Sequence, residues 1–245
     1  MLSVGELRNY GFMVEIGSVS GTVLGTFDIF RALSIDQREQ IANELLMYRV
    51  GKGQFVISDK SSSTDVYFLV SGRIRVCSIA QTGKQIHFEE LLPGMMFGEL
   101  SAIDGLERSS DCLSMEDCTL AIMTSDHFKR VINRHPEVQQ SVLLRLAAMV
   151  RGNMRKVFEF SALTVGQRIH CELLRLASDA RADSPEILLA TVPTHAEIAS
   201  RVSTHREAVT RELKLLETDG LITWKKNHHV IHDVVKLSEM AFNRQ

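Results

Sequence analysis

The sequence predicts an α+β chain in which a small antiparallel barrel or double-sheet β-roll is followed by one long helix and by a helix-rich second domain that ends in a hairpin. Three observations predict this order. Short strand patterns separated by glycine-centred turns fill the first half, an apolar heptad pattern follows Pro136, and two short helical segments meet at a tight turn near Ser203. A chain of 245 residues is long enough to bury two modest cores.

This barrel or β-roll is assigned to residues 27–134, after an N-terminal arm, residues 1–26, for which no regular element is predicted. Apolar residues between Phe27 and Leu45 recur at helical spacing and predict one or two short helices. Residues 81–84 resemble the tip of a hairpin. Strand patterns occur at Val66–Val70, at Arg73–Cys77, through Ile86 and Phe88, and at Cys118–Met123.

The stretch from Phe97 to Ser110 has the composition of a phosphate cradle with a hydroxyl-binding acid beside it. Gly98 allows the backbone to approach a ligand, and a helical turn that opens near Glu99 directs unpaired N–H groups at an anion. Arg108 supplies a planar fork for phosphate, and ionised Glu99 accepts from a sugar hydroxyl. Nucleotide phosphate plus ribose is the implied ligand; a structural ion pair is the alternative.

A long helix with its hinge is assigned to residues 135–163. His135-Pro136-Glu137 is a helix start signal. A stripe at spacings of three and four either packs on its own domain or forms a parallel dimer helix, and an Asn within it favours the dimer because buried Asn fixes coiled-coil register. The stripe consists of Leu143, Leu146, Val150, Asn153, Val157 and Phe160.

The second domain, residues 164–245, contains a predicted helix-turn-helix followed by a hairpin wing. Thr194 and Glu197 form a capping box, and Ser203-Thr204 marks the turn and a new cap. On the second helix, arginine side chains can donate to O6 and N7 of guanine, and a glutamate can accept from N4 of cytosine. These are the contacts that a helix makes in the major groove. A solvated helix face is the alternative. The basic tip at Lys225–Asn227 either contacts phosphate or is a soluble turn.

Composition excludes several classes of protein. The charge balance is 28 − 30 = −2, so no global basic field is present. We expect a cytoplasmic protein without a membrane span, because no apolar run reaches about 18 residues. The four cysteines lack metal-binding spacing, so no metal is expected. No arrangement typical of a nucleophile or paired carboxylates is found, and the enzyme interpretation is set aside.

Two motif sets resemble the CRP/FNR superfamily of transcription regulators, closest to its cAMP receptor protein branch. Phe97-Gly98-Glu99-Leu100 with Arg108-Ser109-Ser110 is similar to the phosphate-binding cassette of cyclic-nucleotide-binding domains, although Ser110 replaces Ala. The resemblance implies that Glu99 binds the ribose 2′-hydroxyl and Arg108 the cyclic phosphate, with Gly98, Leu100 and Ser109 in further contacts and Asn153 near the base. It implies DNA contacts from Thr194, Thr204, His205, Arg206, Glu207 and Arg211.

The function implied by this resemblance is a homodimeric regulator that binds cAMP and palindromic TGTGA-type double-stranded DNA, with RNA polymerase as a further partner. Alternatives keep the DNA reader but replace cAMP by cGMP, by haem on Cys77 or His87, or by no effector. A cyclic-nucleotide module that regulates a partner protein is a further alternative. Two departures from the family lie in the polar, glycine-free segment Ser58–Ser63 and at Ser203, where Gly is common.

Overall fold

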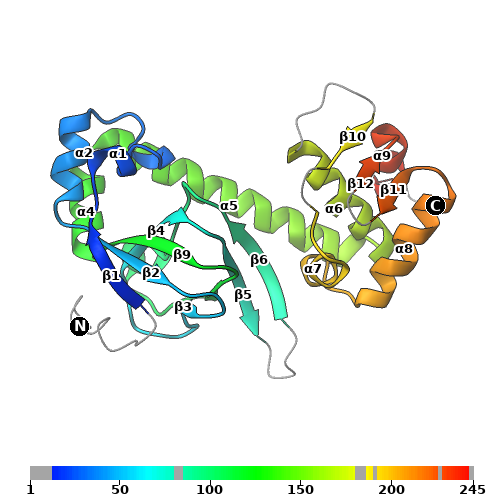
Figure 1. Cartoon of the computed structure of the whole chain (residues 1–245), viewed down its shortest axis with the longest axis horizontal. Coiled ribbons are helices and arrows are strands. Elements are labelled where there is room, and N and C mark those ends of the chain that lie inside the picture. Colours follow the sequence, from blue (N-terminus) through cyan, green and yellow to red (C-terminus); the bar gives the residue numbers. More distant parts are fainter. Residues whose placement is uncertain (1–12, 80–84, 180–185, 190–191, 226–227, 243–245) are drawn as a thin grey trace. The chain divides into compact units, whose positions relative to one another are not determined.

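The computed structural model describes residues 13–79, 85–179, 186–189, 192–225 and 228–242 (Figure 1). The chain divides into two compact units, Met1–Met149 and Val150–Gln245. The boundary lies within the helix α5 (Pro136–Ala162), which begins at Pro136 as predicted. Each unit has its own buried core.

The first unit is built on two antiparallel sheets with the strand orders β1-β2-β9-β4-β7 and β3-β8-β5-β6 (Figure 1). Buried residues of both sheets, among them Tyr67, Ile74 and Leu120, share one core, which makes the sheets a β-roll. The strands are β1 (Met13–Ser18), β2 (Leu46–Val50), β3 (Phe55–Ile57), β4 (Val66–Ser71), β5 (Ile74–Ile79), β6 (Gln85–Leu91), β7 (Met96–Phe97), β8 (Asp111–Ser114) and β9 (Cys118–Met123).

A second core of the first unit lies between the helices and the five-stranded sheet. Phe27 and Phe30 contact the ring of Phe68 on β4, with centroids 5.2 and 5.4 Å apart, and Phe128 and Val138 belong to the same cluster. The helices are α1 (Gly21–Leu24), the 3₁₀ turn η2 (Asp28–Phe30), α2 (Ile35–Ala42), α3 (Glu99–Asp104), α4 (Ser125–Arg134) and the first part of α5.

The structure adds regular elements that the sequence did not predict. Residues 13–26, part of the segment left without an element, contain β1 and α1. Strand β1 is an edge strand that is exposed along most of its length, so it lacks the apolar alternation of a half-buried strand. Helix α4 in the first unit and α9 in the second were also missed. The predicted hairpin tip at 81–84 lies outside the described residues.

The second unit packs four helices and a three-stranded sheet, in the order β10-β12-β11, around a separate core. Thr164 caps α6 in reciprocal contact with Gln167, where the sequence predicted the hinge. The elements are the end of α5, α6 (Val165–Asp179), β10 (Ile187–Leu188), α7 (His195–Arg201), α8 (Arg206–Thr218), β11 (Ile222–Lys225), β12 (His228–Ile231) and α9 (Val234–Phe242).

Candidate functional site

Gly98 is the residue that allows the cassette to close around Arg108. It has φ +82° and is the N-cap of α3, and a Cβ built there would lie 2.7 Å from Nη1 of Arg108 and 2.9 Å from the carbonyl oxygen of Asp65. Both the positive φ and the missing side chain are therefore required. Gly105, with φ +76°, ends the same short helix.

Arg108 is buried, with 3% exposure, and each guanidinium nitrogen donates to the protein. Nη1 donates to the carbonyl oxygen of Gly98 (2.7 Å), Nη2 to that of Asp65 (2.7 Å) and Nε to Oγ of Ser63 (3.1 Å). Its Cζ lies 5.8 Å from the ring centroid of Tyr67. Because a guanidinium has five N–H groups, a second donor remains on each terminal nitrogen, which is the geometry that binds phosphate in bidentate fashion.

The segment Ser58–Ser63 folds directly onto Arg108. Lys60 donates its backbone N–H to the carbonyl oxygen of Arg108, and Arg108 donates its own to the carbonyl of Ser61, both at 3.0 Å. The glycine-free turn that departs from the family is made instead by Lys60, whose φ is +62°. This segment fixes the backbone on both sides of the buried guanidinium.

Glu99 is buried, with 2% exposure, at the first position of α3. Burial raises the pKa of Glu99, and the nearby positive charge of Arg145 on α5 opposes that rise. Nε of Arg145 lies 3.5 Å from Oε1 of Glu99, while its Nη2 donates to the carbonyl oxygen of Met96 at 2.9 Å. Among the described residues, Oε1 of Glu99 has no hydrogen-bond partner. A ligand hydroxyl would satisfy this buried acceptor.

The other predicted ligand residues lie on the surface. Leu100 is 38% exposed on α3, and Ser109 is exposed beside Arg108. Asn153 belongs to the second unit, where its side chain is exposed on α5. Sequence reasoning missed Ser63 and Arg145. A signal for Arg145 was available, because it is the only basic residue between Pro136 and Val150.

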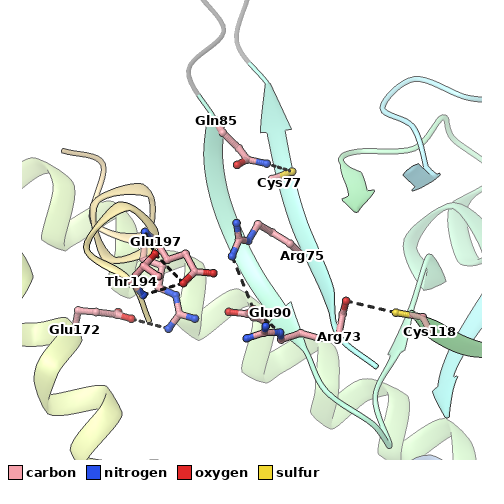
Figure 2. A network of polar contacts seen from close by, with 10 residues as sticks. Arg73, Arg75, Cys77, Gln85, Glu90, Cys118, Glu172, Thr194 and Glu197 are labelled. Carbon is pink, nitrogen blue, oxygen red and sulfur yellow. Dashed lines mark hydrogen bonds and ion pairs between the residues drawn. The ribbon is translucent and has the colours of Figure 1, made fainter. Parts of the chain in front are cut away.

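The helix-turn-helix is formed by α7 and α8. Thr194 caps α7: its N–H donates to Oε2 of Glu197 (2.9 Å), and the Glu197 N–H donates to Oγ1 of Thr194 (3.3 Å), as Figure 2 shows for these labelled side chains. The predicted new cap at Ser203-Thr204 was wrong, because the N-cap of α8 is His205, which makes no side-chain capping bond. Ser203 instead makes the turn, with φ +54°.

One face of α8 is buried, and the opposite face carries the predicted reader side chains. Val209, Leu213 and Leu216 lie in the core of the second unit. His205, Arg206, Glu207 and Arg211 are exposed, Thr194 is exposed at the start of α7, and Thr204 is half-buried in the turn. An open depression along α8 is lined by Arg206, Glu207, Thr210, Arg211, Lys214, Leu215 and Thr218. This is a polar helix face of the kind that enters a major groove.

A buried ion-pair network holds the end of α5 to the helix-turn-helix. Nη1 of Arg175 on α6 lies 2.8 Å from Oε1 of Glu159 on α5, and its Nη2 lies 2.9 Å from Oε2 of Glu172. The other carboxylate oxygen of Glu172 pairs with Arg201 on α7 at 2.9 Å. Both carboxylates are buried, so each needs these partners.

Each of the two units matches a known protein family. Residues 48–135 match the cyclic nucleotide-binding domain family, and residues 167–240 match the Crp-like helix-turn-helix domain family. This chain belongs to the CRP/FNR family. It is therefore a cyclic-nucleotide-binding transcription regulator with a helix-turn-helix DNA-binding domain, not an enzyme. The predicted fold class is confirmed by this match and by the order of roll, long helix and helix-turn-helix.

Curated relatives of this CRP/FNR-family chain carry cAMP in their names. It is 29% identical over 161 residues to the cAMP-activated global transcriptional regulator CRP of Haemophilus influenzae, covering 65% of this chain and 72% of that protein. It is 24% identical over 220 residues to the CRP-like cAMP-activated global transcriptional regulator of Mycobacterium tuberculosis, covering 89% and 98%. A solved CooA variant from Carboxydothermus hydrogenoformans shares the fold, with a TM-score of 0.72, 19% identity, and 81% and 88% coverage.

The residues considered for haem are part of the hydrogen-bonded β5–β6 ladder. Cys77 and His87 pair across the two strands and are both buried. Gln85 donates to Sγ of Cys77 at 3.0 Å, and Glu90 lies 3.4 Å from Arg73 and 3.9 Å from Arg75 (Figure 2). Burial raises the pKa of Cys77, which disfavours the thiolate that binds iron. Within the described residues, no group of three or more potential ligands is placed to hold a metal ion.

None of the helices in the described ranges is both long and apolar enough to cross a bilayer.

Proposed function

We propose that this CRP/FNR-family protein is a homodimer that binds cAMP in the cassette and, in response, palindromic TGTGA-type DNA sites, where RNA polymerase is its further partner. The observation that carries the proposal is the pair of buried groups at the cassette. Arg108 keeps two N–H donors for a phosphate, and Oε1 of Glu99, which has no hydrogen-bond partner among the described residues, is an acceptor for a ribose hydroxyl. The cAMP named in curated relatives supports adenine as the base, and Asn153 is the proposed base contact.

The exposed apolar stripe on α5 supports the homodimer. Leu143, Val150 and Val157, which are spaced seven residues apart, are 54%, 58% and 65% exposed in the single chain. Asn153 is exposed between them. Leu146, predicted as a member of the same seam, packs against the core of the first unit and contributes less to it. A second copy in parallel would bury the stripe and give the two-fold symmetry that a palindrome requires.

Helix α5 is the proposed connection between ligand and DNA. In the first unit, Arg145 ties α5 to Glu99 and to the carbonyl of Met96. In the second unit, Glu159 ties the end of α5 to α6 through Arg175. When a ribose hydroxyl donates a hydrogen bond to the carboxylate of Glu99, the contact between Glu99 and Arg145 changes. Helix α5 then transmits this change to the helix-turn-helix formed by α7 and α8. A coupling of about 1–3 kcal/mol would be ordinary for such linkage.

The effector and the DNA target are tested separately. Calorimetric titration with cAMP, cGMP and 2′,3′-cyclic AMP is expected to show tightest binding of cAMP, and Arg108→Lys is expected to weaken it because a point charge replaces a bidentate fork. If cGMP bound more tightly than cAMP, the result would contradict cAMP as the effector and would favour cGMP.

The DNA target is tested with duplexes that carry the TGTGA palindrome or single-base changes in it. In Arg206→Ala, the difference in binding free energy between the palindrome and the duplex with one particular guanine changed is expected to shrink by about 1–3 kcal/mol. Lys225→Ala is the control, because an exposed lysine at the wing contacts phosphate and should weaken all duplexes equally. Unchanged discrimination by Arg206→Ala would contradict the assigned reader.

A further inference from the structure

Helix α8 is held on one flank by a hydrogen bond that plays no part in the proposed DNA contacts. Nε2 of His170 on α6 lies 2.7 Å from Oε1 of Glu212, and the two side chains are 5% and 22% exposed. Glu212 directly follows the proposed reader Arg211. Because an ionised carboxylate can only accept, Nε2 of His170 carries the proton of this bond.

The surface of α6 leaves room for this carboxylate. Gly166 lies one turn before His170, and a Cβ built at Gly166 would lie 3.2 Å from the carboxyl carbon and from both carboxylate oxygens of Glu212. A side chain at this position would therefore displace the carboxylate. Within the described residues, Nδ1 of His170 has no hydrogen-bond partner, so the bond to Glu212 is the polar contact that fixes the ring.

A second hydrogen bond holds the opposite flank of α8. Oγ1 of Thr210 lies 3.0 Å from the carbonyl oxygen of Arg206, one turn earlier, and 2.9 Å from Nδ1 of His195 on α7. The carbonyl oxygen can only accept, so the hydroxyl donates to it, and Nδ1 of His195 donates to Oγ1. Both chain neighbours of Arg211 are thus bonded to histidines of other helices.

These two bonds define the rotation of α8 about its own axis. A helix turns by about 100° per residue, so Thr210 and Glu212 lie on opposite sides of the stripe that enters the core, and Arg211 lies opposite the stripe. The stripe consists of Val209, Leu213 and Leu216. Apolar contacts have no preferred direction, and the N-cap His205 makes no side-chain capping bond. The two hydrogen bonds, which require defined geometry, therefore restrict the rotation more narrowly.

We propose that His170 and Glu212 form a positioning pair that sets the rotation of α8 and thereby the direction in which Arg211 meets its base pair. A buried polar pair of this kind contributes a unique orientation rather than net stability. The inference rests on the proposed function, because it requires α8 to read bases in the major groove. Breaking the pair should lower sequence discrimination and leave the phosphate contacts, which carry no sequence information, in place.

The test measures discrimination, which is the dissociation constant for a TGTGA palindrome with one base pair changed, divided by that for the unchanged palindrome. Fluorescence anisotropy at fixed salt with saturating cAMP gives both constants. Arg211→Ala identifies the base pair that Arg211 reads, because discrimination is lost there. His170→Phe, which removes the donor and keeps a ring of similar size, is expected to lower discrimination at that base pair by about 2- to 10-fold, the value of one hydrogen bond. Its affinity for a duplex without the palindrome is expected to match the wild type.

Two further variants separate the hydrogen bond from the packing around it. Glu212→Gln is the conservative variant, because its amide oxygen still accepts from Nε2 of His170, and it is expected to keep most of the wild-type discrimination. Glu239→Gln, which removes an exposed carboxylate on α9, is the control for the lost charge and is expected to match the wild type.

The double variant His170→Leu with Glu212→Leu replaces the pair by apolar side chains, a change that usually preserves stability. It is expected to lose as much discrimination as His170→Phe, and its unfolding in urea is followed by the fluorescence of Trp224. If the double variant does not fold, His170→Phe decides the question, because the partly exposed carboxylate of Glu212 can turn to water in that variant.

A double-mutant cycle separates positioning from a purely structural role. If the pair acts through Arg211, His170→Phe should lower discrimination at the Arg211 base pair when Arg211 is present and should have no further effect there in the Arg211→Ala background. An equal weakening of all duplexes by His170→Phe would show a structural role only and would overturn the inference.

The remaining outcomes separate this inference from the proposed function. If the folded double variant, or His170→Phe, keeps the full wild-type discrimination while Arg211→Ala loses it, the inference fails and the proposed function stands. If the wild-type protein does not discriminate among sequences, the proposed function fails and this inference fails with it.

Discussion

Arg145 and Glu99 form an ion pair in which Nε and Oε1 are 3.5 Å apart, and within the described residues neither atom has a hydrogen-bond partner. The pair joins α5 to the first residue of the cassette helix. Burial raises the pKa of Glu99 against the opposing charge of Arg145. The free protein thus holds a buried carboxylate that is poorly satisfied, which destabilises the unliganded state and leaves an acceptor for a ligand hydroxyl.

Glu99→Gln is expected to weaken cAMP binding without destabilising the free protein. The amide loses a charge-assisted hydrogen bond to the ribose, so affinity should fall about 10- to 100-fold. The substitution also removes a buried charge, and Arg145 keeps Glu89, 3.6 Å away, as a partner, so the free protein should not be destabilised. Calorimetry measures the affinity, and thermal unfolding without ligand measures stability. A melting temperature that falls in proportion to the affinity would assign Glu99 a structural role instead.

The affinity for cAMP is expected to fall on acidification. The fall should begin at a higher pH than it would if Glu99 had the pKa of an ordinary glutamate. Because the pKa of Glu99 is raised, the carboxylate is protonated above the ordinary range and then no longer accepts the ribose hydroxyl as an anion. The same shift makes the contribution of Glu99 to the free energy of unfolding smaller as pH rises through the folded pKa. Titrations from about pH 8 down through the ordinary range of a glutamate, about pH 4.3, measure the effect. Glu99→Gln should lack this step, and an identical pH profile in the variant would contradict the assignment.

Val150→Asp is expected to convert the proposed homodimer to a monomer. Val150 is 58% exposed on α5 and would face its counterpart across the dimer seam, where two carboxylates repel each other. Val235→Asp is the matched control, since Val235 is 71% exposed on another helix, α9. Sedimentation equilibrium gives the masses. A dimeric Val150→Asp protein, or a monomeric Val235→Asp protein, would argue against the α5 seam.

Arg175→Met is expected to destabilise the second unit by about 2–3 kcal/mol, because it leaves the buried carboxylates of Glu159 and Glu172 with fewer partners. Trp224, the only tryptophan of the chain, lies in this unit and reports its unfolding in urea by fluorescence. Arg151→Met, an exposed arginine of α5, is the control. Equal urea midpoints for the two variants would show that the network does not hold α5.

Elements with local signals could be predicted from the sequence. The apolar run of β4, the start of α5 at Pro136 and the capping box of α7 each depend on neighbours in the chain, and the structure confirms all three. The N-cap of α8 was misplaced because the turn uses a positive φ at Ser203, which sequence alone does not reveal.

Contacts that cross the fold could not be predicted in the same way. Asp65 and Ser63 meet Arg108 from 43 and 45 residues away, and they do so because β4 lies beside β7, which leads into the cassette. The pairing of Arg145 with Glu99 requires α5 to reach the cassette. The charged pattern of α8 was visible in the sequence, whereas the hydrogen bond from His195 that orders Thr210 depends on how α7 packs on α8.

The proposed switch is tested most directly by the affinity of the wild-type protein for a labelled TGTGA palindrome, measured by fluorescence anisotropy with and without saturating cAMP. We expect cAMP to tighten binding by about 5- to 150-fold, and we expect Arg108→Lys to abolish most of this increase while binding DNA weakly in both conditions. The same affinity with no nucleotide, with cAMP and with cGMP would contradict a cyclic-nucleotide switch.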